Sequence, residues 1–225
     1  MTDAFQTILM QLRDATGHDF TLYKRHFIEQ QIEWLMTQKN IDNANDYARY
    51  LFENPSEIQV LFKEFLINVT YFFRDAAAFK VLEKEILPRL CEGKTDKDVF
   101  RVWVVGCSTG EEAYSIAMLL FERIKQTGQN FKIQIYGTDL DDESIAIARE
   151  GIYPCSISKH VTSERLRRFF TKEKTGYRIK KEIQEKVIFS VHNVIKDTLP
   201  DVSFDLLTCR NLMIYLTPEC NNNWF

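Results

Sequence analysis

The 225-residue sequence lacks the marks of several large protein classes. It has no run of about 18 apolar residues, and its first residues lack the pattern of a signal peptide. The sequence therefore predicts a cytoplasmic protein without membrane insertion. The net charge of −3 argues against nucleic acid as a partner. The five cysteines form no C-x-x-C pair and do not group with the four histidines, which argues against a metal site and a disulfide framework.

What is present fits one globular domain, or one domain with a smaller partner, because 45% of the residues are hydrophobic and 27% are charged. The first 90 residues have helical periodicity; the apolar set Phe27, Ile28, Ile32, Leu35 and Met36 is one example. A helix is expected to start at Asn54-Pro-Ser-Glu57. The polar segment 91–98 divides the chain into an all-helical domain, 1–90, and a second domain, 98–225.

The second domain alternates strands and helices, which predicts an α/β fold with a parallel sheet. The expected strands are 100–105, 132–137 and 203–209, and the expected helices are 113–124 and 141–149. Two further strands, 176–180 and 186–191, are separated by only a few residues. They predict a small antiparallel insertion or hairpin at about 170–192.

One stretch predicts a buried strand, then a glycine turn, then the start of a helix. It is Arg101-Val-Trp-Val-Val-Gly-Cys-Ser-Thr-Gly-Glu-Glu112. Such a turn directs backbone N–H groups and the positive end of a helix at one point. No Lys follows Gly110, and the spacing from Gly106 is not G-x-G-x-x-G. Glu111 and Glu112 would repel a pyrophosphate but suit S-adenosylmethionine, which carries an ammonium and a sulfonium. The alternative is a packing turn with solvated carboxylates.

Asp139 lies 29 residues beyond Gly110, at the expected end of the second strand. An acidic residue in that position of a βαβ unit faces ribose hydroxyls, and a carboxylate accepts strong hydrogen bonds from them. The alternative for Asp139 is a helix cap. Asp141 or Asp142 is better placed for capping, because the helix begins after them.

Five segments, in order, resemble the CheR-type chemotaxis receptor methyltransferases. They are 68–75, 102–115, 137–141, 148–153 and 209–215. The resemblance covers nearly the whole chain and is closest to the methyltransferase segment of fused methylesterase–methyltransferase proteins. It implies an N-terminal helical domain and a class I, Rossmann-like sheet. It also implies that S-adenosylmethionine methylates glutamate side chains of bacterial chemoreceptors and leaves S-adenosylhomocysteine.

The resemblance also assigns residues. Arg74 and Tyr215 would be catalytic, near the methyl group and the incoming carboxylate. The cofactor would be held by Asn68, Thr70, Arg74, Gly106, Gly110, Glu111, Glu112, Asp139, Asn193, Val194, Arg210 and Asn211. Which of the two glutamates holds the amino-acid end stays open. Without the motif, Arg74 would be read as a surface residue pairing with Asp75, and Tyr215 as core.

The implied reaction needs little catalytic machinery. A glutamate carboxylate is ionised at neutral pH and is itself the nucleophile. It attacks the activated methyl group by in-line displacement, so no general base is required. Positioning and the removal of water would provide the catalysis.

The sequence departs from the family in two places, and each departure leads to a different expectation about function or assembly. The family tends to carry a basic cluster after Tyr-Lys, whereas Glu29, Gln30, Gln31 and Glu33 stand here, which predicts a different or more weakly steered protein substrate. The resemblance ends near Glu219, before the remaining strands of the family's sheet, which predicts a truncated sheet and a dimer through its exposed edge.

Three functions follow: methylation of chemoreceptor helices or another acidic protein, a cofactor-binding or receptor-docking module without turnover, or a methyltransferase for small molecules. The insertion disfavours the third, because the resemblance implies that such a unit can dock a receptor tail as an added strand.

Overall fold

The computed structural model describes residues 3–198 and 202–218, which fall into two compact units. The helical unit consists of Met1–Ile67 with Asn211–Phe225, and the sheet unit is Asn68–Arg210. The helical unit contains α1 (Asp3–Thr16), α2 (Arg25–Lys39), α3 (Ala44–Glu53) and α4 (Ser56–Phe65). All of the predicted apolar set of α2 is buried, and α4 begins where Asn54-Pro-Ser-Glu57 predicted.

Sequence-distant segments complete the helical unit. Tyr23 and Leu216 form an antiparallel bridge, and the Thr217 amide donates to the Leu22 carbonyl at 2.8 Å. Asn43 caps α3 by accepting from the Asp46 amide. The helices pack through aromatic side chains, with the ring of Phe65 5.0 Å from that of Phe20. The unit is thus a small bundle closed by a return of the chain.

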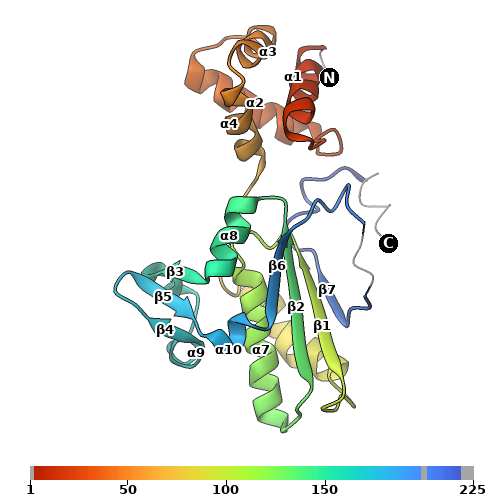
Figure 1. Cartoon of the computed structure of the whole chain (residues 1–225), viewed down its shortest axis with the longest axis vertical. Helices are drawn as coiled ribbons and strands as arrows, with labels where there is room; N and C mark the ends of the chain where they lie inside the picture. The colour runs from red at the N-terminus through yellow and green to blue at the C-terminus, as the bar shows by residue number, and fades with distance from the viewer. Residues whose placement is uncertain (1–2, 199–201, 219–225) are drawn as a thin grey trace. The chain divides into compact units, whose positions relative to one another are not determined.

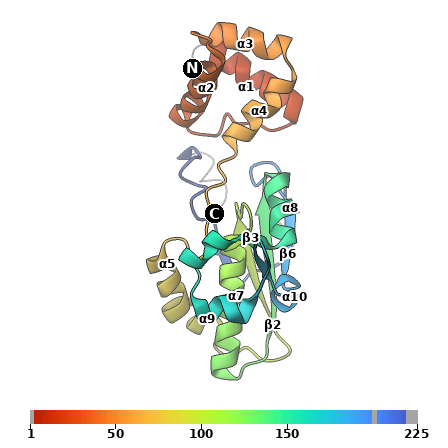
Figure 2. The ribbon, with the colours of Figure 1, turned by 90° about the vertical axis from the view of Figure 1, so that its left-hand side faces the viewer.

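The sheet unit is built on four parallel strands in the order β6-β2-β1-β7, which confirms the predicted α/β fold (Figure 1). The strands are β1 (Val99–Val105), β2 (Lys132–Asp139), β6 (Val187–Val191) and β7 (Leu206–Thr208). Helix α7 (Glu111–Thr127) follows β1 and packs against β2, and α8 (Asp142–Glu150) packs against β2 and β6 (Figures 1 and 2). Strand β1 is buried because it is central and apolar on both faces.

The segment before β1 belongs to the sheet unit. It comprises α5 (Ala76–Val81), one turn of π-helix, η1 (Leu82–Ile86), and α6 (Leu87–Leu90). Phe79, Leu82 and Leu87 share one hydrophobic core with β1 and α7. This grouping differs from the boundary predicted at 91–98, because these apolar side chains need the sheet unit to be buried.

The expectation of a hairpin between 176–180 and 186–191 is wrong. The second of these segments is β6, which pairs in parallel with β2 in the main sheet. The small antiparallel sheet has the order β3-β5-β4 and contains β3 (Ile152–Pro154), β4 (Phe170–Lys172) and β5 (Gly176–Ile179). The turn of α10 (Lys181–Gln184) separates β5 from β6, and the buried Val187 and Phe189 direct β6 to the main sheet.

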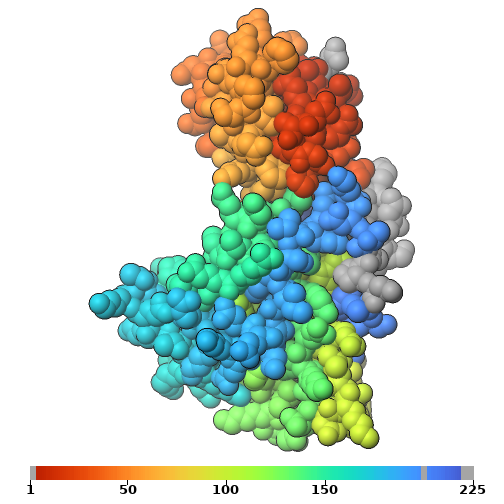
Figure 3. Space-filling model, in the orientation of Figure 1, coloured from red at the N-terminus to blue at the C-terminus, as the bar shows by residue number. Residues whose placement is uncertain are grey.

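The connection from β3 to β4 contains the 3-10 helix η2 (Cys155–Lys159) and helix α9 (Ser163–Phe169). Together with the antiparallel sheet it projects from the side of the unit (Figure 3). Phe72 ties it to the rest of the unit through edge-on ring contacts with Tyr153 and Phe170, at 4.8 and 5.5 Å between ring centroids. Among the described strands β7 lies at one edge of the main sheet. The further strands that the family resemblance implies were expected beyond Glu219, outside the described residues, and the dimer stays a prediction.

Candidate functional site

The glycine loop between β1 and α7 has a backbone that few side chains tolerate. Gly106, Ser108 and Gly110 have φ values of 67°, 47° and 92°. A Cβ on Gly110 would lie 2.9 Å from both Ala148 Cβ and Phe189 Cζ. Glycine is required there by conformation and by space, because helix α8 and strand β6 close directly over the turn. The loop is therefore a fixed feature of the fold.

Asp139 ends β2 directly beside this loop. Its Oδ2 accepts a hydrogen bond from the Ser108 amide at 2.7 Å, and its Oδ1 accepts from the Asp141 amide at 3.0 Å. Burial raises the pKa of the Asp139 carboxyl, and these amides oppose the rise. The capping role belongs to Asp141, whose Oδ1 accepts from the Glu143 amide. The sequence-based preference for Asp141 or Asp142 as the cap is confirmed.

The two glutamates at the start of α7 differ in their partners. Oε2 of the buried Glu111 accepts from the Thr109 hydroxyl at 2.7 Å. Oε2 of Glu112 accepts from Arg210 at 3.0 Å, whereas its buried Oε1 has no hydrogen-bond partner in the described part of the chain. Burial raises the pKa of both carboxyls, and at Glu112 the Arg210 guanidinium opposes the rise. Of the pair, only Glu112 has a buried oxygen that makes no hydrogen bond of good geometry within the described residues, and the Thr208 hydroxyl lies close to that carboxylate.

The segment from Asn68 to Asp75 is bound to the glycine loop and to α7. The Asn68 amide group donates to Asp141 Oδ2 at 2.5 Å, and the Ser108 hydroxyl lies 3.4 Å from Asn68 Oδ1. The Phe73 amide donates to the Ser115 hydroxyl at 3.0 Å. Phe73 itself has a φ of 55°, a conformation that is strained for a bulky residue and is typical of functional segments. Thr70 is half-buried in the same segment.

Arg74 and Arg210 have different surroundings. Arg74 donates to the Val69 carbonyl, and its guanidinium lies 5.9 Å from the Tyr71 ring centre. Arg210 binds Asp75 Oδ2 at 2.9 Å, the Arg74 carbonyl at 2.8 Å and Glu112. The alternative reading of Arg74, a surface arginine paired with Asp75, is not found in the structure, where Arg210 binds that carboxylate. Arg210 thereby ties the end of β7 to the Arg74 segment.

Asn193 and Val194 follow β6 at the same edge of the sheet. The His192 amide donates to the Asp139 carbonyl at 2.9 Å, which brings this turn against the end of β2. The Asn193 amide donates to Asp197 Oδ2 at 2.7 Å, and Val194 is half-buried. The carboxyl ends of all four parallel strands therefore carry predicted site residues. That edge is where open α/β sheets bind ligands.

Asn211 and Tyr215 fall in the helical unit. The Tyr215 carbonyl accepts from the Lys24 amide at 2.7 Å, and its ring lies 5.1 Å from that of Phe27. Asn211 has a left-handed backbone with φ of 62°. The roles of these two residues stay predictions.

Three contributors were not among the predicted site residues. Asp141 accepts from Asn68, Ser115 accepts from Phe73, and the Tyr153 hydroxyl donates to the Thr109 carbonyl at 2.7 Å. All three stand in segments that resemble the family, but the partners are 42 to 73 residues apart. Only the capping signal at Asp141 was visible locally.

Within residues 3–198 and 202–218, no group of three histidine, cysteine, aspartate or glutamate side chains could hold a metal ion. The described helices include none with the length and apolar character needed to cross a bilayer.

Comparison with known families assigns both units. The model of the CheR methyltransferase S-adenosylmethionine-binding domain matches residues 68–224, and that of the CheR methyltransferase all-alpha domain matches residues 3–66. The chain belongs to the CheR methyltransferase family. Its cofactor is S-adenosylmethionine, and the predicted pair of helical and cofactor-binding domains is confirmed.

Curated relatives agree with this family. A chemotaxis protein methyltransferase of Borreliella burgdorferi is 33% identical over 98% of this chain and 80% of its own length. One of Salmonella typhimurium is 30% identical over 96% of this chain and 74% of its own. An uncharacterized 104.1 kDa protein of Rhodobacter capsulatus is 34% identical over 94% of this chain, which spans only 22% of that larger protein.

Proposed function

We propose that this CheR-family chain methylates glutamate side chains of chemoreceptors in the bacterial cytoplasm, with S-adenosylmethionine as the methyl donor. One observation carries the proposal: an acidic glycine loop and an arginine-bearing segment are joined by hydrogen bonds at the carboxyl edge of a parallel sheet. The loop suits a cationic cofactor, and the arginine suits an anionic acceptor.

The described residues fit the cofactor. The buried Oε1 of Glu112 lacks a partner and would accept from the cofactor ammonium, which favours Glu112 over Glu111 for that role. Asp139 would bind the ribose, and Asn193 with Val194 would contact the adenine. Asn68 and Thr70 would cover the cofactor from the segment before α5. When bound, the cofactor supplies an electrophilic methyl group on a sulfonium.

Arg74 is the residue that we propose holds the substrate glutamate. Its guanidinium is planar and permanently charged, and it can bind a carboxylate with two parallel hydrogen bonds. Within the described residues its side chain donates to the Val69 carbonyl and lies over the Tyr71 ring, and its charge acts on the nearby Glu112 carboxylate without forming an ion pair with it. The glutamate attacks as a carboxylate, so no base takes a proton. The protein's part is to align the reactants and remove their water.

The test is methyl transfer to receptor cytoplasmic fragments that contain glutamate helices. Labelled S-adenosylmethionine should give base-labile methyl esters, and fragments with Gln in place of those glutamates should give none. Calorimetry with the cofactor alone is the parallel measurement. Cofactor binding without ester would favour the docking module, and esters on small carboxylic acids alone would favour the small-molecule enzyme.

A further inference from the structure

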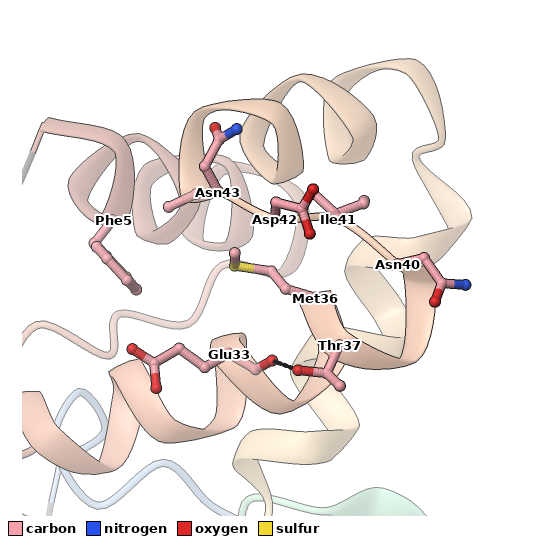
Figure 4. A pocket seen from close by; sticks show the side chains of 9 residues that line it. Phe5, Glu33, Met36, Thr37, Asn40, Ile41, Asp42 and Asn43 are labelled. Atoms are coloured by element: carbon pink, nitrogen blue, oxygen red, sulfur yellow. Dashed lines mark hydrogen bonds between the residues drawn. The ribbon is translucent and has the colours of Figure 1, made fainter.

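The helical unit has an open cavity between the start of α1, the end of α2 and the start of α3 (Figure 4). Its volume is about 590 Å³, within the range of ligand-binding clefts. The cavity is lined by Phe5, Glu33, Met36, Thr37, Asn40, Ile41, Asp42, Asn43 and Ala44. It lies outside the site described above and has no role in the proposed chemistry.

The cavity combines an apolar floor with an acidic rim. Met36 is buried, and in Figure 4 its side chain extends into the space between α2 and the loop with Asp42 and Asn43. Phe5 and Ile41 are half-buried beside it. The exposed carboxylates of Glu33 and Asp42 make no hydrogen bond or ion pair within the described ranges. A long side chain with an apolar stem and a cationic head matches this arrangement.

The end of α2 adds to the negative potential. Asn40 ends the helix with a φ of 56°, and the last carbonyls of a helix carry partial negative charge. None of the nine lining residues is cationic. Lys39 is nearby in sequence, but its ammonium is bound to Glu57 at 2.7 Å. The unit as a whole is acidic, with ten acidic and six basic residues between Asp3 and Ile67.

An exposed tryptophan extends this surface along α2. Trp34 is 48% exposed, and it lies one helical turn before Thr37, which lines the cavity. Residues three or four apart are neighbours on a helix surface, so Trp34 lies beside Thr37, at the edge of the cavity. Exposed tryptophans are typical of protein interfaces. A small free cation would fill only the cavity, whereas a protein segment would cover both features.

We infer that this surface, Trp34 with the cavity of Glu33 and Asp42, docks a basic segment of a partner protein. A Lys or Arg side chain enters the cavity, with its stem on Met36 and its charge at the two carboxylates. An apolar residue one turn away in the partner covers Trp34. The inference concerns recognition alone and does not depend on methyl transfer.

The test is calorimetry on the full chain without cofactor, at about 0.1 M salt. The probes are a set of helical 14-residue peptides that combine Lys or Arg with Leu, the same peptides with Glu in place of the cations, and spermidine. We expect binding of basic peptides only. The double variant Glu33→Gln with Asp42→Asn should weaken it about tenfold, and Trp34→Ala several-fold.

The matched control is Glu53→Gln, which removes an exposed charge of the same unit away from the cavity. It should leave the affinity unchanged, and thermal melting should show that every variant is folded. The inference fails if no basic peptide binds, if acidic peptides bind equally, or if Glu53→Gln weakens binding as much as the double variant. It fails as well if spermidine binds as tightly and Trp34→Ala has no effect.

Discussion

The two units of this chain differ in how firmly they hold the side chains at their candidate binding surfaces. In the sheet unit, the side chains at the candidate site are held by contacts between distant segments, such as Asn68 with Asp141 and Arg210 with Asp75. In the helical unit, several large apolar side chains lie exposed on helix faces, among them Trp34 and Phe52. A cofactor of fixed structure requires a fixed site, whereas a protein partner can be changed by surface substitutions alone.

The largest effect should come from Arg74, if the sheet unit holds the reacting carboxylate. Arg74→Ala should lower kcat/KM for receptor methylation by roughly 100-fold or more, because a charged donor to the reacting group is lost. Arg74→Lys should recover only part of the rate, since it lacks the planar fork. The exposed Arg167→Ala is the control. Equal rates for Arg74→Ala and the parent would remove Arg74 from the reaction.

Gly110 tests how rigid the site loop is. Gly110→Ala should destabilise the fold by roughly 2–4 kcal/mol, because it adds an overpacked methyl group to a left-handed backbone. Gly93 has a similar φ of 72°, but a Cβ added there would meet no atom within 4 Å. Gly93→Ala should therefore lower the free energy of unfolding by only about 1–2 kcal/mol. Denaturant unfolding measures both. Similar losses for the two variants would mean that the contacts with Ala148 and Phe189 are soft.

Asp141 tests whether the Asn68 segment is positioned from a distance. Asn is as good a helix cap as Asp, so Asp141→Asn keeps the cap but weakens the acceptor for the Asn68 amide group. We expect cofactor affinity to fall about tenfold with little change in melting temperature. The exposed neighbour Asp142→Asn should change neither quantity. A loss of stability with unchanged affinity would limit Asp141 to capping.

Substitutions in the helical unit should change the rate of receptor methylation and leave cofactor affinity unchanged. Gln30→Arg combined with Gln31→Arg adds positive charge to α2 and should raise methylation of an acidic receptor helix by about threefold, through faster encounter at low salt. Cofactor affinity should not change. The exposed Gln59→Arg on α4 controls for net charge. If the α2 variant and the control give the same rate, α2 does not steer the substrate.

The smallest effect is a pH dependence at Glu112. Its pKa is raised above 4.5 by burial, so the folded chain binds this proton more tightly than the unfolded chain. The resulting stability is present below pH 4.5 and is lost as pH rises through the raised pKa. Glu112→Gln cannot show this loss, so the unfolding free energy of the variant should increase relative to that of the parent as pH rises from 4.5 through the raised pKa. The exposed Glu182→Gln gives the baseline, and a constant difference would contradict the shift.

Local patterns were sufficient where the physical cause is local. The helical period of α2 and the Pro-containing start of α4 predicted elements that the structure has. The order of strands and helices predicted the parallel sheet, because parallel strands need crossovers. The local pattern failed at 186–191, where two strands close in sequence suggested a hairpin. Strand β6 pairs instead with β2, since its buried Val187 and Phe189 need the main sheet.

The sequence by itself determined the family, the cofactor and the positions of most candidate site residues, because these depend on short motifs whose residue types are set by chemistry. Only the tertiary structure decided which side chains share a partner. Arg210 rather than Arg74 takes Asp75, Glu112 rather than Glu111 presents a buried oxygen without a partner, and Asp141 holds Asn68. Such contacts join residues up to 135 positions apart, and burial by the assembled sheet and helices sets both their geometry and their pKa values.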